Sequence, residues 1–321
     1  MMFSILFSFL LTFQTSQQTE RNTLYSVTAL NGNTAIAVGE KGTIARTTNG
    51  GKKWNYTYSL GKQSNSLFSV CFTDKKHGWI VGGNGVILKT SDSGITWKNL
   101  DSSSNYTLTC IRFADILNGW IVGSRGFILK TSDGGNTWNR QYSNITDDLW
   151  SVSVFNSSIA WISGASGTII KTTDGGKTWE KSKSGFTNSF FSIIFADSLN
   201  GWSCGGYGSI LNTTDGGKKW RPQNTREEFI YFKTNNFHYG IHFSNAHTGW
   251  VIGNSGVIMK TINGGKNWID QKSDTEEVLH SCFALNNEVA WIVGADGMIL
   301  KTTNGGNKWE IQVSNSTYEK Y

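Results

Sequence analysis

The sequence predicts an all-β, single-domain protein: a seven-bladed β-propeller of four-stranded antiparallel blades. Three observations carry this prediction. A turn of the form T-x-[DN]-x-G-x-x-W recurs seven times, its closing tryptophans lie 41 to 48 residues apart, and each interval divides into four short strand-like segments. Repeats of about forty residues with four strands each are typical of propeller blades, and no stretch keeps the 3.6-residue period of a helix.

The seven turns are TTNGGKKW (47–54), TSDSGITW (90–97), TSDGGNTW (131–138), TTDGGKTW (172–179), TTDGGKKW (213–220), TINGGKNW (261–268) and TTNGGNKW (302–309). They predict a propeller over residues 24–313, with blades at about 24–66, 67–107, 108–148, 149–189, 190–236, 237–278 and 279–313, and a C-terminal tail over 314–321. No blade is divided between the two ends of this range. Closure of the ring is therefore expected from packing of the first blade against the seventh, unless residues 312–319 add a strand there.

The second repeat illustrates the strands. They are predicted at 67–72, 78–81, 86–90 and 95–100. Alternation in the first of them places Phe68, Val70 and Phe72 on one face. Because one such sheet exposes two apolar faces, the blades must pack face to face in a circle to bury them.

Two positions of the repeat fit this packing. The third residue of each first strand is small, as expected at the crowded centre: Ser26, Ser69, Cys110, Ser151, Ser192, Gly240 and Ser281. The second strand carries a large anchor in six repeats and Ile36 in the first: Trp79, Trp120, Trp161, Trp202, Trp250 and Trp291.

The turn motif is interpreted as structural. Its Asp or Asn accepts hydrogen bonds from its own turn, glycine supplies the left-handed conformation, and the tryptophan covers the hairpin. Seven copies cannot all serve one active site, so these residues are not expected to be catalytic. The turn residues with an aspartate in the second to fifth repeats are Asp92, Asp133, Asp174 and Asp215, with Trp97, Trp138, Trp179 and Trp220.

Composition excludes several functions. The formal net charge is +6, but the lysines are spread over the repeats and form no basic stripe, so no nucleic-acid partner is expected and the lysines are interpreted as solvated surface residues. Four cysteines, Cys71, Cys110, Cys204 and Cys282, lack the spacing of a zinc site. They are expected to be buried free thiols, with a Cys71–Cys110 disulfide as the alternative. We predict no metal and no cofactor.

The N-terminus is apolar from Phe3 to Phe13, with no charge before Glu20. Residues 1–20 are therefore predicted to be a signal peptide, and the protein to be exported to the periplasm, the cell envelope or the medium. An apolar N-terminal tail is the alternative. No later segment approaches the roughly twenty apolar residues of a membrane span, so the mature protein is expected to have none, and to be a monomer.

The complete repeat, with GWxVGxxGxIxKT before the turn, resembles the propellers of photosystem II stability and assembly factors, over residues 24 to 313. The turn itself is similar to the Asp-box, or bacterial neuraminidase repeat. The resemblance implies a non-catalytic propeller that binds a protein partner during assembly. Photosynthetic members share an arginine-rich contact patch, whereas this chain has seven arginines against 22 lysines, and lysine does not reproduce the bidentate contacts of arginine.

Binding is expected on the face that carries the turns between second and third strands, because these turns differ between repeats, although surface drift explains the variation equally well. The candidate residues are Arg125, Tyr207 and Asp296 in these turns, Arg112 and Trp150 in first strands, and Arg226, Phe229 and Tyr231 in the long connection 221–236. His238, His242 and His280 are further candidates for the channel mouth, and the first two are expected to share a face of one strand.

Two other functions remain open. A sialidase-like glycoside hydrolase needs two carboxyl groups about 5–10 Å apart, and the candidates are Asp148, Glu227, Glu228 and Asp296. No Arg-Ile-Pro signature of sialidases is present, since the single proline, Pro222, directly follows an arginine. A carbohydrate-binding propeller without turnover needs exposed tryptophans, and Trp150 alone lies outside the repeat positions.

Overall fold

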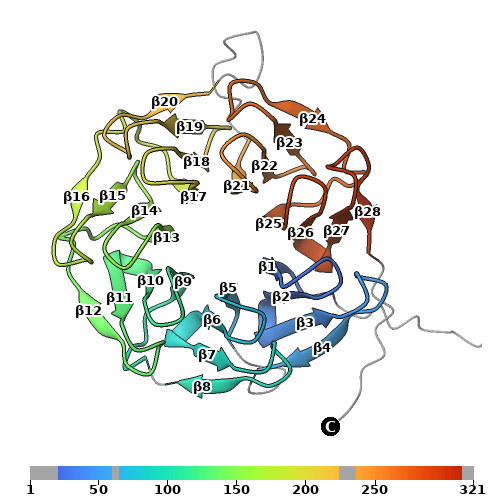
Figure 1. Ribbon diagram of the computed structural model, residues 1–321, viewed down its shortest axis with the longest axis horizontal. Coiled ribbons are helices and arrows are strands. Elements are labelled where there is room, and N and C mark those ends of the chain that lie inside the picture. Colours follow the sequence, from blue (N-terminus) through green and yellow to red (C-terminus); the bar gives the residue numbers. More distant parts are fainter. Residues whose placement is uncertain (1–20, 60–64, 101, 224–235, 313–321) are drawn as a thin grey trace, which may run out of the picture.

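The computed structural model describes residues 21–59, 65–100, 102–223 and 236–312, which form seven sheets in a ring around a central axis (Figure 1). Each sheet contains four antiparallel strands that follow one another in the sequence, with the first strand innermost and the fourth at the outer edge. The predicted fold class is confirmed. In the part of the chain that the structure describes, no helix is long and apolar enough to cross a membrane.

The first strands are β1 (Leu24–Ala29), β5 (Leu67–Phe72), β9 (Leu108–Phe113), β13 (Leu149–Val154), β17 (Phe190–Phe195), β21 (His238–Phe243) and β25 (Leu279–Ala284). The second strands are β2 (Ala35–Gly39), β6 (Gly78–Gly82), β10 (Gly119–Gly123), β14 (Ala160–Gly164), β18 (Gly201–Gly205), β22 (Gly249–Gly253) and β26 (Ala290–Gly294). The third strands are β3 (Thr43–Thr47), β7 (Ile87–Thr90), β11 (Phe127–Thr131), β15 (Ile169–Thr172), β19 (Ile210–Thr213), β23 (Ile258–Thr261) and β27 (Ile299–Thr302). The fourth strands are β4 (Asn55–Tyr58), β8 (Lys98–Leu100), β12 (Asn139–Gln141), β16 (Glu180–Lys181), β20 (Arg221–Pro222), β24 (Ile269–Gln271) and β28 (Glu310–Ile311).

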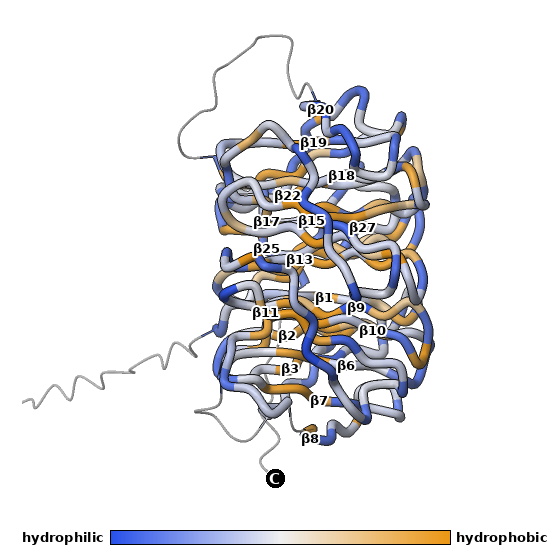
Figure 2. The backbone as a smooth tube through the Cα atoms, turned by 90° about the vertical axis from the view of Figure 1, so that its left-hand side faces the viewer, coloured by the Kyte–Doolittle hydropathy of each residue, from blue (hydrophilic) through white to orange (hydrophobic). Residues whose placement is uncertain are grey.

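The core lies between neighbouring blades. Second strands such as β6 and β14 are buried along their whole length, and hydrophilic residues concentrate at turns on the two faces of the disc (Figure 2). In three of the blades the second-strand tryptophan stacks on a phenylalanine from the next blade, as Trp161 does on Phe195 with ring centroids 3.6 Å apart. Such stacking fixes the angle between adjacent sheets and adds about 0.5–1.5 kcal/mol to the burial of the rings.

Polar contacts near the axis also join the blades. The small third residue of the first strand is most often serine, and its hydroxyl accepts a hydrogen bond from a backbone N–H of the neighbouring first strand. Val70 donates to Ser26 Oγ at 3.2 Å, and Ile111 donates to Ser69 Oγ at 3.3 Å. Crowding explains the small size of this position, and the inter-blade hydrogen bond explains why serine fills it.

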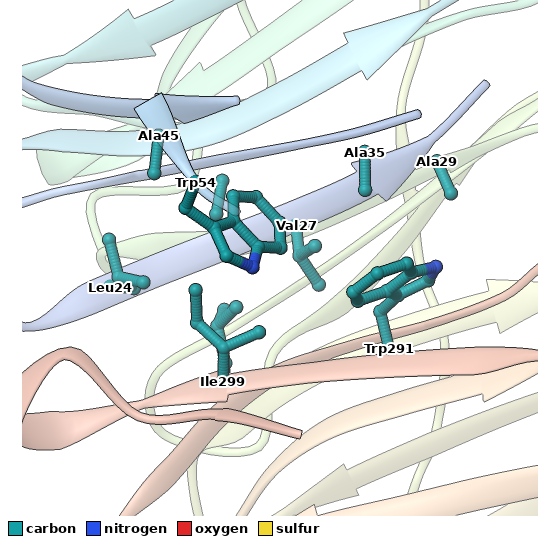
Figure 3. Packing of buried hydrophobic residues seen from close by; sticks show 10 residues of the cluster. Leu24, Val27, Ala29, Ala35, Ala45, Trp54, Trp291 and Ile299 are labelled. Atoms are coloured by element: carbon teal, nitrogen blue, oxygen red, sulfur yellow. The ribbon is translucent and has the colours of Figure 1, made fainter. Parts of the chain in front are cut away.

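The ring closes by non-covalent contact between the first and seventh blades. Trp54 and Trp291 meet edge to face at 5.6 Å within a cluster that includes Leu24 and Ile299 (Figure 3). Val27 N–H donates to Ser281 Oγ at 3.4 Å across the same boundary. Every sheet consists of consecutive strands, so among the described residues no terminal strand is exchanged to seal the ring. Residues 313–321 lie outside the described residues.

The interpretation of the lysines as solvated surface residues is wrong for lysines of the third strands. Lys130 Nζ lies 4.6 Å from the centroid of Trp120 and donates to the carbonyl of Gly175, in the repeat turn of the next blade, at 2.8 Å. Lys260 reaches Gly305 in the same way, at 2.7 Å. Lys301 donates to the carbonyls of Gly32 and Gly50 at 3.0 Å, across the closure. These ammonium groups therefore join neighbouring blades through hydrogen bonds.

All four cysteines are buried and free, which confirms the predicted thiols and excludes the alternative Cys71–Cys110 disulfide. Burial raises the pKa of Cys71 and of Cys282 to about 12. We therefore expect no reaction of the native protein with a thiol reagent such as Ellman's reagent at pH 8, and four equivalents after unfolding in guanidinium chloride. Rapid modification of one thiol in the folded protein would contradict this expectation.

Candidate functional site

Each first strand contains a β-bulge at its second residue. In β5, Leu67 lies opposite Gly82 and Ser69 lies opposite Val81, so Phe68 has no partner in the ladder. The same shift occurs in the other six first strands. A bulge re-aims the side chain of the extra residue. It also corrects the prediction for 67–72, because Phe72 shares its face with Leu67 and Val70 but not with Phe68.

The bulge residues all line a cavity of about 370 Å³ in the centre of the ring. They are Tyr25, Phe68, Thr109, Trp150, Phe191, Tyr239 and His280. Each is only partly buried, whereas the preceding residue of each strand is fully enclosed between blades. The structure thus brings Trp150, a candidate from the sequence, together with aromatic residues that the sequence analysis did not single out.

Six of these rings form a continuous wall around the cavity. We call it the aromatic wall; its members are Trp150, Phe191, Tyr239, His280, Tyr25 and Phe68, in order around the axis. Successive centroid distances are 6.3, 5.4, 5.4, 5.3 and 5.2 Å, all within the usual range for aromatic pairs. The signal was present in the sequence as an aromatic residue before the small third position in six repeats.

The wall is interrupted at β9, where Thr109 replaces an aromatic residue. Its hydroxyl lies 2.6 Å from the carbonyl oxygen of Leu149 and 3.1 Å from that of Val122. Three residues further along the same strand, Arg112 also lines the cavity. Its Nη1 donates to Ser69 Oγ at 3.1 Å and to the carbonyl of Ile111 at 2.8 Å. The cavity is therefore lined by aromatic rings from six blades and by a cationic side chain, Arg112, from the third blade.

The three candidate histidines occupy different environments. His238 is buried between blades and does not line the cavity, whereas His242 and His280 do. The bulge at Tyr239 places His238 and His242 on opposite faces of β21, so the predicted shared face is wrong. Burial lowers the pKa of His242 to about 4, and its Nδ1 accepts a hydrogen bond from the Ala284 N–H at 3.2 Å. It is neutral at pH 7.

The other candidates lie on one face of the disc. Hydrogen bonds join the turn between second and third strands to the incoming connection from one blade to the next, as from Gly126 N–H to the Asp147 carbonyl at 2.8 Å. We call this side the linker face. Arg125, Tyr207 and Asp296 occupy equivalent left-handed positions on it, with φ of 55°, 56° and 49°, but in the third, fifth and seventh blades. They are thus distributed around the ring.

Some candidates fall outside the described residues: Arg226, Phe229 and Tyr231 of the long connection, together with Glu227 and Glu228. Of the four carboxylates considered for hydrolysis, Asp148 and Asp296 are described. Asp148 accepts a hydrogen bond from the Arg125 N–H at 2.8 Å, beside the fourth blade, while Asp296 belongs to the seventh. Among the described residues no group of three or more His, Cys, Asp or Glu side chains is placed to hold a metal ion.

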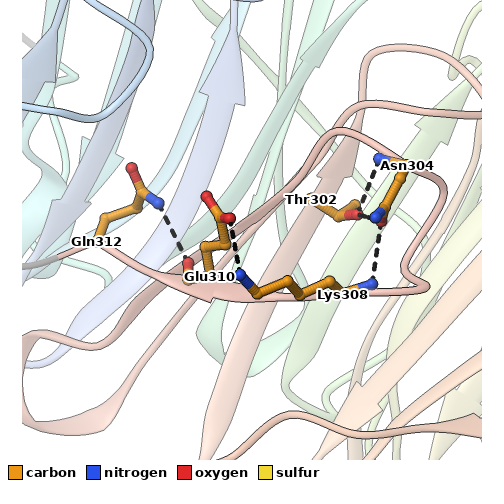
Figure 4. A network of polar contacts seen from close by, with 5 residues as sticks. All are labelled: Thr302, Asn304, Lys308, Glu310 and Gln312. Carbon is orange, nitrogen blue, oxygen red and sulfur yellow. Dashed lines mark hydrogen bonds and ion pairs between the residues drawn. The ribbon is translucent and has the colours of Figure 1, made fainter.

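The repeat turns lie on the opposite face and form a local hydrogen-bond network. In the seventh, Gly306 N–H donates to Thr302 Oγ1 at 2.8 Å, and Lys308 N–H donates to Asn304 Oδ1 at 3.0 Å (Figure 4). Thr302 Oγ1 in turn donates to Asn304 Oδ1 at 3.0 Å. The same contacts occur with an aspartate in the third turn, where Thr137 N–H donates to Asp133 at 3.0 Å. The polar groups of the turn are occupied by the turn itself.

These contacts predict sensitivity to acid. Hydrogen bonds from the side chain and backbone of Thr137 lower the pKa of Asp133 to about 2, and Thr178 has the same effect on Asp174. A folded-state pKa below the unfolded value of about 3.9 stabilises the fold above that pH, and this contribution disappears as the pH falls from about 4 to 2. Urea midpoints should therefore drop over this range, and less steeply in an Asp133→Asn, Asp174→Asn double variant.

Asparagine is a suitable replacement because it already occupies this position at Asn263, where its Oδ1 accepts from the Asn267 N–H at 3.0 Å. The control is Asp296→Asn, outside the repeat turns. An unchanged acid dependence in the double variant would show that these carboxylates do not carry the effect.

Fold and cavity together define a class of protein: a seven-bladed propeller of bacterial-neuraminidase-type repeats with a rigid ring and a variable linker face. The family model described as "Photosynthesis system II assembly factor YCF48" matches residues 56–144, 93–185 and 223–317. These matches cover more than half of the 321 residues, and the chain belongs to this family. No curated protein sequence matches the chain.

Solved structures of similar fold include members of this family. One, described as "YCF48 bound to D1 peptide", has a TM-score of 0.73 and 17% identity over 89% of this chain and 93% of that one. YCF48 from Cyanidioschyzon merolae has a TM-score of 0.70 and 17% identity, covering 88% and 96%. The Niastella koreensis GH74 enzyme reaches 0.73 with 15% identity, covering 91% of this chain and 54% of that one. At these identities the similarity establishes the fold alone.

Proposed function

We propose that this chain is an exported, non-catalytic interaction propeller that binds a protein partner and aids its assembly or stability. Its membership of the assembly-factor family, matched over most of its length, is the observation that carries the proposal. The structure described as YCF48 with a D1 peptide is evidence, for that protein, that this fold presents a surface to a polypeptide. By analogy, we place the partner of this chain on its linker face.

The division of labour between the two faces supports this placement. Side chains of the repeat turns form hydrogen bonds within their own turn, and lysines of the preceding blade bind the backbone of two of these turns. The polar groups of the opposite face therefore hold the ring together. On the linker face, Arg125, Tyr207 and Asp296 differ in charge and size at equivalent positions. A rigid scaffold with variable turns is the usual arrangement of a recognition surface. Because arginine is scarce in this chain, we propose an envelope or secreted protein as the partner rather than a photosystem.

A capture experiment tests the proposal. The tagged protein would be used to isolate partners from native envelope extract, beside an Arg125→Gly, Tyr207→Gly, Asp296→Gly variant, which keeps the left-handed turns without strain. A Lys177→Ala, Lys218→Ala, Lys266→Ala variant on the opposite face is the matched control. We expect a partner whose recovery falls at least about tenfold with the first variant, corresponding to about 1.4 kcal/mol, and is unchanged with the second.

Equal recovery with both variants would contradict a linker-face site. Hydrolysis of aryl glycosides by the purified protein, abolished by Asp296→Asn, would instead favour the glycoside hydrolase alternative. Saturable binding of oligosaccharides without turnover, abolished by Trp150→Leu, would favour a carbohydrate-binding propeller.

Export is tested separately. Residues 1–30 fused to alkaline phosphatase, which is active only after export, should give activity in a bacterial host. A fusion that lacks residues 3–13, the apolar run, should not. Equal activity of the two fusions would contradict the signal peptide.

A further inference from the structure

The central cavity has the composition of a ligand site that the proposed function does not use. Its volume of about 370 Å³ lies in the range of small-molecule pockets, which is about 300–1,000 Å³. First strands from all seven blades line it, so the same inter-blade contacts that hold the ring hold the site. Such a cavity needs no rearrangement of the fold to form.

One side of the cavity offers stacking surface. The aromatic wall runs around six blades, with tilted or edge-on rings such as Tyr25 against Phe68 at 40° and Tyr25 against His280 at 60°. Burial also lowers the pKa of His280, which favours its neutral form. A flat, apolar body placed here would contact several rings at once, and each such contact favours binding.

The other side offers a cation without a counter-ion. Arg112 lies in the same strand as Thr109 and lines the cavity. Both of its hydrogen bonds go to neutral oxygens, Ser69 Oγ and the Ile111 carbonyl. The described residues that line the cavity include arginine but no aspartate, glutamate or lysine. A guanidinium that faces no carboxylate in a partly enclosed site attracts anions and repels cations.

Glu40, a carboxylate that contacts Tyr25 of the aromatic wall, does not compensate this charge. Glu40, in the turn after β2, accepts hydrogen bonds from the Thr23 N–H and the Tyr25 hydroxyl, each at 3.1 Å. It does not line the cavity, and its partners belong to the first blade whereas Arg112 belongs to the third. The charge of Arg112 therefore remains available to a ligand.

We propose that the central cavity binds a small organic anion: a carboxylate on a flat, apolar body, with the body against the aromatic wall and the carboxylate at Arg112. The guanidinium fork matches a carboxylate in two parallel hydrogen bonds. The arrangement selects against cationic ligands, which Arg112 repels, and against neutral aromatics, which leave it unpaired. This inference is independent of the proposed partner on the linker face.

Calorimetry with 1-naphthoate and its uncharged isostere 1-naphthamide tests the proposal on the wild-type protein. We expect 1-naphthoate to bind at least about tenfold more tightly than 1-naphthamide, since a charge-assisted pair to arginine distinguishes them. Arg112→Gln should abolish this preference, and Trp150→Leu should weaken both ligands. Arg125→Gln, on the linker face, is the matched control and should change neither affinity.

Equal affinity of the two probes, no binding of 1-naphthoate, or an unchanged preference in folded Arg112→Gln would overturn the proposal. If Arg112→Gln fails to fold, the comparison of the two probes on wild-type protein still decides between acceptance and rejection. Because these measurements use no protein partner, their failure leaves the capture experiment interpretable, and the reverse also holds.

Discussion

Replacing Trp291 with alanine is expected to lower the free energy of unfolding by about 3–5 kcal/mol, the usual cost of removing a fully buried tryptophan. Its side chain has no exposed surface, meets Trp54 edge to face at 5.6 Å, and lies under the ammonium of Lys301 at 4.6 Å. Both contacts lie at the boundary between the seventh and first blades. Because the two blades are joined there by packing and a few hydrogen bonds rather than by an exchanged strand, this cavity weakens the closure of the ring.

Urea unfolding followed by circular dichroism measures this effect. Ile95→Ala is the control, because Ile95 is 66% exposed and surface truncations usually change stability by less than about 0.5 kcal/mol. A loss below about 1 kcal/mol in Trp291→Ala would show that the closure does not depend on this ring.

Replacing Gly126 with alanine is expected to cost about 2–5 kcal/mol. Gly126 has φ of +65°, where an L-residue pays about 1–2 kcal/mol, and a methyl group there would meet the carbonyl oxygen of Ile145 in the incoming connection. Overpacking against backbone adds about 1–3 kcal/mol. The same glycine N–H donates to the Asp147 carbonyl, so relief of the clash would also break the contact that fixes the linker face.

Two other glycines separate the contributions. Gly185 has φ of +77° but nothing within 4 Å of its would-be methyl, so Gly185→Ala should show the conformational cost alone. Gly32 has neither constraint, and Gly32→Ala should be neutral or slightly stabilising. If all three variants unfold at the same urea concentration, close packing of the turn against the connection is not what requires glycine at position 126.

The histidines illustrate where prediction from the strand pattern failed. A regular strand with period two places His238 and His242 on the same face, as the alternation rule requires. The bulge at Tyr239 inserts one residue, so His238 is enclosed between blades while His242 reaches the cavity. Alternation alone carries no information about a bulge, because a bulge is a shift in register between two strands and leaves the extra residue unpaired.

The lysines show a second limit. In the sequence, nothing distinguishes Lys130 and Lys301 from lysines that are exposed to solvent. In the structure their ammonium groups donate to glycine carbonyls of the neighbouring blade. The acceptor of Lys301, Gly50, lies 251 positions away in the chain, so only closure of the ring brings the two together.

The sequence by itself determined the number of blades, the strand content and the family, because a repeated turn and a repeated tryptophan are local patterns that each blade must satisfy. It also identified Arg112 and Trp150 as unusual residues of first strands. That these two line one cavity, with the bulge residues of five other blades beside them, was decided only by the tertiary structure. The physical reason is that the bulges re-aim one side chain from every first strand, and ring closure then brings the seven first strands together around one cavity.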